Sequence, residues 1–186
     1  AVRVAARDAA APARAKAVRE RVGATIGNAG NAGVALAICD AIHENAAYLS
    51  QIDGETGDGD HGINMNKGFL MSKDRITGDM TLAEALKTIG STLVKDIGGS
   101  MGPIYGTFFE ALADGLDVDE FDAIDLAEAL DDVVAALKDL AGAKEGDKTL
   151  IDTAAPAARA FSTSVAEGAP LSEALDALAT GAADGL

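Results

Sequence analysis

Residues 122–142 read DAIDLAEALDDVVAALKDLAG, and this stretch decides the fold class. Its large apolar residues recur in steps of three and four, the spacing that places side chains on one face of an α-helix. They are Leu126, Leu130, Val133, Leu137 and Leu140. The pattern stops at Gly142, a residue type that commonly follows a helix because it adopts left-handed backbone angles. The stretch therefore predicts one long amphipathic helix.

The same spacing recurs along most of the chain. It predicts helices over residues 32–50, 81–95, 122–140 and 149–166, and a last one from Pro170 through Leu178. Thr81 and Glu84 form a capping box at the start of one helix, and Asp147 or Thr149 begins another. No stretch alternates with period two over the length of a strand, so we expect an all-α protein.

Composition bounds the function. The chain has 186 residues, which fits one domain, and a formal net charge of -15. Such acidity excludes a general nucleic-acid binder, because phosphate neutralisation needs clustered Lys and Arg. An anionic ligand would need metal ions or backbone N–H groups to offset the repulsion. No apolar run is long enough for a membrane span and no signal-peptide pattern is present, so we expect a cytoplasmic protein that uses no membrane.

The charge is uneven along the chain. Residues 1–24 carry six basic and two acidic residues, a net of +4, which leaves -19 for residues 25–186. A transit peptide or a basic nucleic-acid arm is one interpretation of this segment. We favour an N-terminal extension or linker over residues 1–31. Cys39, the single cysteine, is expected to be a small buried apolar residue and not a catalytic thiol.

Residues 53–66 read DGETGDGDHGINMN and place four carboxylates within eight residues, among glycines that let the backbone fold back. Like charges so close repel unless a cation lies among them, and oxygen ligands suit Mg²⁺, Mn²⁺ or Ca²⁺. A calcium EF-hand is excluded, because its twelfth position would be Phe69 or Asn64 and not Glu. The alternative is a solvated acidic turn in which Asp60 caps the following helix.

The HGINMN segment opens an amphipathic helix, whose free N-terminal N–H groups form a phosphate site beside the metals. We expect His61 to be a hydrogen-bonding or ligand-contacting group, with a catalytic role as the less favoured alternative. His43, on the apolar face of the first helix, is interpreted as a core or surface residue.

Two further glycine-rich segments interrupt the helices. Residues 98–106 read GGSMGPIYG, a glycine loop that leads into a helix with Pro103 near its first turn, so that this helix start can also receive phosphate oxygens. Residues 142–152 read GAKEGDKTLID. A phosphate-binding P-loop is excluded there because Asp147 separates the glycine from the lysine and no strand precedes it. We expect a helix start, with Lys148 paired to a carboxylate.

Together and in this order, the three segments resemble the nucleotide-binding L subunit, or C-terminal domain, of dihydroxyacetone kinases. The resemblance covers residues 32–186 and rests chiefly on the first segment. It implies an up-and-down antiparallel barrel or bundle of about eight helices, with ADP or ATP held at one end through two Mg²⁺ ions.

The resemblance also implies roles for individual residues. The metal ligands would be Asp53, Asp58 and Asp60. The phosphates would be contacted by His61, Gly62, Ile63, Asn64, Ser100 and Met101, and the adenine bordered by Gly142 and Leu150. Family members continue into a terminal Asp-Pro-Gly-Ala lid, which we expect this chain to lack. Met101 stands where small residues are common in the family.

The implied activity is phosphoryl transfer to an alcohol group of dihydroxyacetone or a related short hydroxyketone. A separate K subunit or domain would hold that substrate on its own histidine, so no catalytic residue is expected in this chain. The phosphate would come from ATP or from a phosphotransferase-system protein. Two alternatives stay open: a fatty-acid-kinase-type domain, which usually has Thr where His61 stands, and a non-catalytic ADP-holding regulatory module.

Overall fold

The helices predicted from the sequence are present in the structure, a computed structural model that describes residues 23–185. They are α1 (Ala32–Asp53), α2 (His61–Arg75), α3 (Leu82–Asp96), α4 (Met101–Gly115), α5 (Ala123–Ala141), α6 (Leu150–Ala166) and α7 (Leu171–Asp184). The all-α class is confirmed, with seven helices in the described residues. The first 22 residues of the expected extension lie outside the described part of the chain.

The helix boundaries follow the capping residues. The Thr81 hydroxyl accepts a hydrogen bond from the backbone N–H of Glu84 at 3.1 Å, and the Glu84 carboxylate accepts one from the N–H of Thr81, as predicted. Helix α5 ends at Gly142, which has a φ of 61°. Of the two candidates for the start of α6, Thr149 holds the cap position. Helix α1 continues three residues beyond the predicted end at Ser50.

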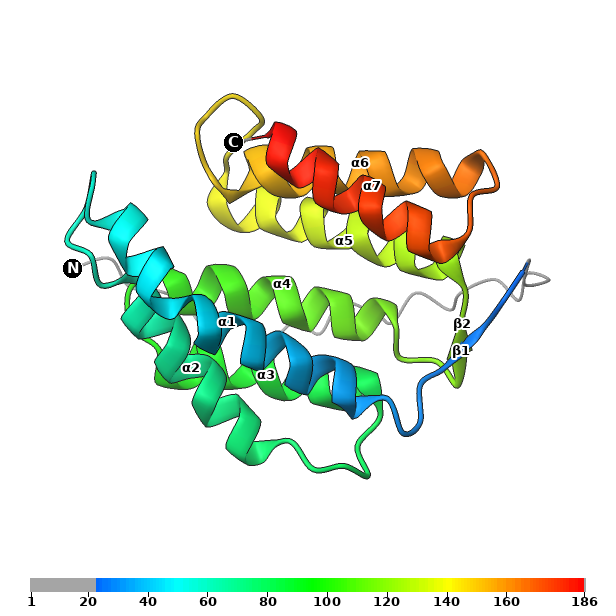
Figure 1. Ribbon diagram of the computed structural model, residues 1–186, viewed down its shortest axis with the longest axis horizontal. Helices are drawn as coiled ribbons and strands as arrows, with labels where there is room; N and C mark the ends of the chain where they lie inside the picture. The colour runs from blue at the N-terminus through cyan, green and yellow to red at the C-terminus, as the bar shows by residue number, and fades with distance from the viewer. Residues whose placement is uncertain (1–22, 186) are drawn as a thin grey trace.

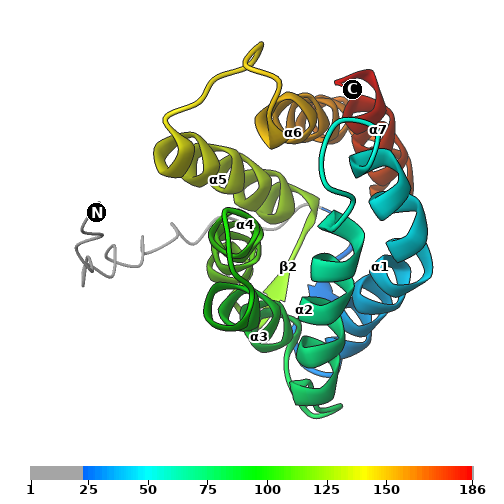
Figure 2. The same cartoon turned by 90° about the vertical axis from the view of Figure 1, so that its left-hand side faces the viewer.

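Successive helices run back and forth along the long axis of the molecule (Figure 1). Each packs against the next in chain order, from α1 to α7, and the end-on view shows them arranged around a ring (Figure 2). The loops that follow α1, α3 and α5 therefore lie at the same end of the bundle (Figure 1). These are the three glycine-rich segments of the sequence, and their common location follows from antiparallel helices joined by short loops.

The main core lies between α1, α2, α3 and α4. Phe69 and Phe109 are both buried there, with ring centroids 5.5 Å apart in an edge-to-face arrangement. Cys39 is also buried, and this burial raises the pKa of its thiol to about 11, as expected for an apolar role. A smaller cluster around Val133 and Ile151 joins α5 to α6. Within residues 23–185, every helix is too short or too polar to traverse a bilayer.

A short two-stranded ladder lies at the end of the bundle opposite the three glycine-rich segments (Figure 1). Strand β1 (Ile26–Gly27) pairs antiparallel with β2 (Glu120–Phe121). Beside it, the buried side chain of Asn28 donates to the carbonyls of Leu116 and Val118, both at 2.9 Å, and accepts a hydrogen bond from the N–H of Ala83. Residues 26–28, which the sequence analysis assigned to the extension, thus contact the helical bundle directly.

Candidate functional site

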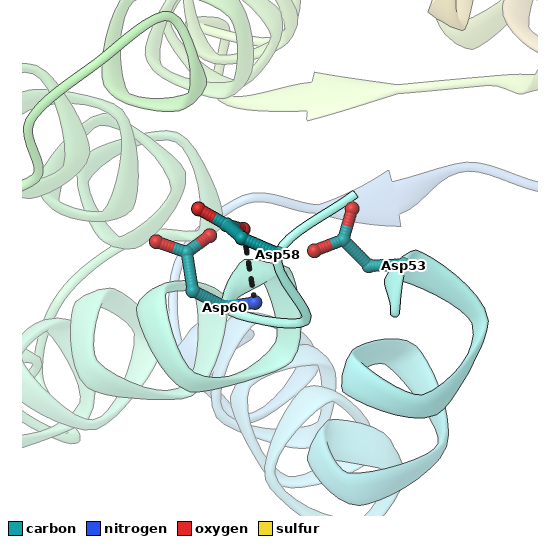
Figure 3. A group of neighbouring side chains, drawn as sticks. All are labelled: Asp53, Asp58 and Asp60. Atoms are coloured by element: carbon teal, nitrogen blue, oxygen red, sulfur yellow. Dashed lines mark hydrogen bonds between the residues drawn. The ribbon is translucent and has the colours of Figure 1, made fainter. Parts of the chain in front are cut away.

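The loop after α1 brings three carboxylates together. Asp53 is the last residue of α1, Asp58 lies in the loop, and Asp60 immediately precedes α2. One carboxylate oxygen from each lies within 4.8 Å of the other two. Figure 3 shows Asp53 facing the loop that carries Asp58 and Asp60. Glu55, the fourth carboxylate of this segment, is exposed and lies outside the group.

Backbone hydrogen bonds shape this loop around Asp53. The N–H groups of Thr56 and Gly57 donate to the Asp53 carbonyl. A Cβ atom added to Gly57 would lie 2.7 Å from Asp53 Oδ1, so the loop passes too close for a side chain. Gly59 has a φ of 76°, in the left-handed region that favours glycine. Gly57 and Gly59 are therefore required by the path of the loop.

The alternative interpretation of this segment, a solvated acidic turn in which Asp60 caps the following helix, is wrong in the capping hydrogen bond. Asp60 occupies the cap position of α2, but its side chain makes no capping hydrogen bond. Instead, Asp53 Oδ2 accepts a hydrogen bond from the backbone N–H of His61 at 3.2 Å. Within residues 23–185, the carboxylate of Asp60 therefore takes no part in capping α2.

Basic side chains of residues 23–185 do not balance the charge of the three carboxylates. No ion pair formed within residues 23–185 includes any of them. Three anionic groups at this separation repel one another unless a cation neutralises them. A donor set made of carboxylate oxygens is the type that magnesium, manganese and calcium prefer. The residues present therefore fit a divalent cation.

Helix α2 begins directly beside this cluster. Its first residue, His61, is half-buried, and Ile63 is 66% exposed. In the first helical turn the N–H of His61 is bonded to Asp53 and that of Asn64 to the carbonyl of Asp60, whereas helix geometry gives the N–H groups of Gly62 and Ile63 no acceptor within the helix, so these two can bind an anion. Gly62 holds this helix start close to α1, because a Cβ atom there would lie 1.9 Å from the carbonyl oxygen of Ala46. The predicted phosphate-contacting residues through Asn64 thus surround one helix N-terminus.

A contact that the sequence analysis missed connects the first two glycine-rich segments. The Tyr105 hydroxyl on α4 lies 3.4 Å from His61 Nε2, and the two rings meet edge to face with centroids 5.9 Å apart. Tyr105 belongs to the GGSMGPIYG segment, where its position one turn into the helix was the available signal. His43, the other histidine, is exposed and its Nδ1 lies 2.9 Å from the side-chain oxygen of Asn66.

The second segment ends in the start of α4. Ser100 is exposed and precedes the helix without forming a side-chain cap, and Met101 is the half-buried first residue, packed against the main core. Gly102 lies tight against the end of α3, since a Cβ atom there would lie 2.3 Å from the carbonyl oxygen of Ile97. A second helix N-terminus therefore lies at the end of the bundle that carries the three glycine-rich segments, which we call the loop end (Figure 2).

The third segment forms an exposed loop at the same end. Gly142 is exposed, and Leu150 is half-buried at the start of α6. The carboxylate of Asp152 accepts hydrogen bonds from the N–H groups of Gly146 and Thr149, and these bonds lower its pKa.

The ion pair predicted for Lys148 is not formed within residues 23–185. Lys148 instead has a φ of 58°, in the left-handed region. The carboxylate of the neighbouring Glu145 is paired with Lys138 and Arg159, and the Arg159 guanidinium holds the pKa of that carboxyl below its usual range. The basic residues that pair with this loop thus come from the preceding helix, as Lys138, and from the following helix, as Arg159.

Fold and site together define a class of protein: an all-α domain in which one end of an antiparallel bundle combines three carboxylates that could hold a metal ion with two helix N-termini. A family model described as the DAK2 domain matches residues 55–186, most of the chain. The chain belongs to the DAK2 domain family.

Several relatives carry names that specify a ligand. The ADP-binding subunit DhaL of PEP-dependent dihydroxyacetone kinase 1 from Listeria innocua is 34% identical over 124 residues, 66% of this chain and 63% of that protein. The corresponding DhaL subunit from Escherichia coli is 31% identical over 145 residues, 74% of this chain and 67% of that protein. L-erythrulose kinase from Pectobacterium atrosepticum is 32% identical over 141 residues, 73% of this chain and 24% of that protein.

A solved structure shares the fold. The crystal structure of the dihydroxyacetone kinase from C. freundii in complex with AMP-PNP and Mg²⁺ superposes with a TM-score of 0.62 at 26% identity, covering 89% of this chain and 31% of that one. The chain spans 63% and 58% of the length of two of the DhaL relatives that it matches.

Proposed function

We propose that this chain binds ADP or ATP together with magnesium at the loop end of the bundle, as the nucleotide-binding part of a kinase for dihydroxyacetone or a related short hydroxyketone. The observation that carries the proposal is the convergence of Asp53, Asp58 and Asp60 beside the N-terminus of α2. The names of the relatives support it, because they include ADP-binding subunits and a kinase for L-erythrulose, another short hydroxyketone.

Each group of residues at the loop end of the bundle has a distinct role in the proposed site. The three aspartates hold two magnesium ions, and the first turn of α2 binds phosphate oxygens through backbone N–H groups and the side chains of His61 and Asn64. Ser100 and Met101 at the start of α4 provide a second set of N–H groups. Gly142 and Leu150 border the adenine. The nucleotide phosphates are thus held between cations and helix N-termini, which offsets the net charge of -19 over residues 25–186.

In the proposed phosphoryl transfer, this chain contributes by positioning the nucleotide and by holding the cations that offset its charge. Bound magnesium ions neutralise charge on the transferred phosphoryl group. The chain's own residues bind and orient the nucleotide, and they supply no nucleophile. The acceptor ketone is held by a K-type subunit or domain, and a phosphotransferase-system protein or ATP supplies the phosphate. Comparing turnover with these two donors, in the presence of a K-type partner, identifies the source.

The test compares two carboxylates of the same loop. Asp58→Asn removes one charge from the cluster, whereas Glu55→Gln removes an exposed charge outside it. We expect titration calorimetry with ADP and magnesium to show loss of binding in the first variant and wild-type affinity in the second. Circular dichroism of both variants should match the wild type. Unchanged nucleotide affinity in Asp58→Asn would refute the metal assignment.

A further inference from the structure

Tyr105 links the two helix N-termini of the proposed nucleotide site. Its ring packs against the main core, and its hydroxyl faces the ring of His61, with 3.4 Å between the oxygen and Nε2. Among residues 23–185, the hydroxyl has no other hydrogen-bond partner, and Nδ1 of His61 has none at all. One ring nitrogen of His61 is therefore engaged by the protein and the other is left for a ligand.

We propose that Tyr105 is a positioning residue of the nucleotide site: its hydroxyl donates a hydrogen bond to His61 Nε2 and thereby keeps the N–H of the neutral ring on Nδ1, where it can donate to a phosphate oxygen. The inference rests on the proposed function for the identity of the ligand, whereas the contact between the two side chains stands on the structure alone.

A tyrosine hydroxyl can donate or accept a hydrogen bond, so its role at Nε2 and the tautomer of His61 are linked. A neutral imidazole has one donor nitrogen and one acceptor nitrogen, so a donor at Nε2 requires the proton to be on Nδ1. Burial raises the pKa of Tyr105, which keeps its hydroxyl protonated and able to donate. An imidazole in the opposite tautomer would present a lone pair at Nδ1, which a phosphate oxygen repels. The tyrosine thus reserves the only N–H of the neutral ring for the anion.

A purely structural role for Tyr105 would depend on its ring and not on its hydroxyl. Tyr105→Phe keeps the ring, the edge-to-face contact and the packing against the core, and it removes the oxygen alone. The chain offers matched controls, because it holds two tyrosines and two histidines. Tyr48→Phe changes a tyrosine that is 60% exposed, and His43→Gln identifies the nuclear magnetic resonance signals of the remaining histidine.

The first measurement needs no ligand. Nitrogen-15 spectra of the histidine rings, recorded where both are neutral, should show the N–H of His61 on Nδ1 in the wild type and in Tyr48→Phe. In Tyr105→Phe the signals should shift toward a mixture of both tautomers. The same tautomer pattern in the wild type and in Tyr105→Phe would overturn the inference.

The second measurement is the affinity for ADP with magnesium, by calorimetry. Loss of one hydrogen bond that orients a ligand-binding group should weaken binding about fivefold in Tyr105→Phe. In a His61→Ala background, Tyr105→Phe should cause no further loss, because its effect passes through the imidazole. An additional loss of similar size in that background would contradict the inference. A wild-type chain that fails to bind the nucleotide would refute the proposed function, while the tautomer measurement would still decide the role of Tyr105.

Discussion

The last residue of α1 caps the first residue of α2, because Asp53 Oδ2 accepts a hydrogen bond from the backbone N–H of His61 at 3.2 Å. One carboxylate thus belongs both to the acidic cluster and to the helix start where an anion can bind. In the proposed site, this single side chain would therefore set where a metal lies relative to the start of α2.

Two substitutions of Asp53 separate these roles. Both Asp53→Asn and Asp53→Ala remove the charge, but only asparagine keeps an oxygen that can accept the N–H of His61. With a chelator present, we expect Asp53→Asn to exceed Asp53→Ala in free energy of unfolding by about 1 kcal/mol, the usual value of an N-terminal cap. Urea titrations measure this difference. Both variants should lose magnesium-dependent nucleotide binding, and equal stabilities would show that the cap contributes nothing.

Gly62→Ala should disrupt both the fold and the site. The added methyl group would lie 1.9 Å from the Ala46 carbonyl oxygen, so the start of α2 must move away from α1. Overpacking of this kind costs about 1–3 kcal/mol of the free energy of unfolding. Gly33→Ala is the control, because no atom lies within 4 Å of a Cβ at that position on α1. Thermal unfolding should show a clear loss for the first variant and none for the second.

Nucleotide binding should depend on the divalent cation and not on ionic strength. Residues 25–186 carry a net charge of -19, so a nucleotide without metal is repelled. We expect a chelator to abolish binding of ADP, and added salt to fail to restore it, since screening weakens distant repulsion but supplies no ligands for the phosphates. Calorimetry with and without chelator checks this. Strong binding in the absence of metal would contradict the electrostatic argument.

The loop before α6 should contribute a pH-dependent part of stability through Asp152. Backbone N–H groups lower its pKa in the folded chain, so the ionised form favours folding. This contribution is complete above the unfolded value of about 3.9 and is lost as the pH falls through the lower folded value. The stability difference between wild type and Asp152→Asn should therefore shrink below about pH 4. Urea titrations at neutral and acidic pH measure it, and a constant difference would argue against the assignment.

Local features of this protein could be predicted from residue spacing. The capping box of Thr81 and Glu84, the end of α5 at Gly142 and the burial of Cys39 all agree with the structure. The convergence of Asp53, Asp58 and Asp60 was also predictable, because the three belong to one glycine-rich turn and span only eight residues of sequence. Interactions over such short separations depend mainly on backbone geometry, which the local sequence specifies.

Other local contacts depended on side-chain competition. The sequence analysis considered Asp60 as a cap for α2, but Asp53 makes that hydrogen bond. It also expected an ion pair for Lys148, whereas Glu145 is paired with Lys138 and Arg159 from the flanking helices. At the start of α2 and in the loop before α6, the sequence offers several carboxylates close together. Exposed ion pairs and caps differ little in energy, so residue spacing alone does not select the partner.

The sequence by itself thus determined the helices, the helix ends at Thr81 and Gly142, and the acidic turn, because these follow from periodicity, capping and short-range repulsion. Only the tertiary structure decided that Tyr105 meets His61 across 44 positions and that Gly62 lies against Ala46. Such contacts depend on which helix faces pack together and on how far each helix extends before the chain turns. That choice is made by burial of apolar surface over the whole bundle, and no short stretch of sequence contains it.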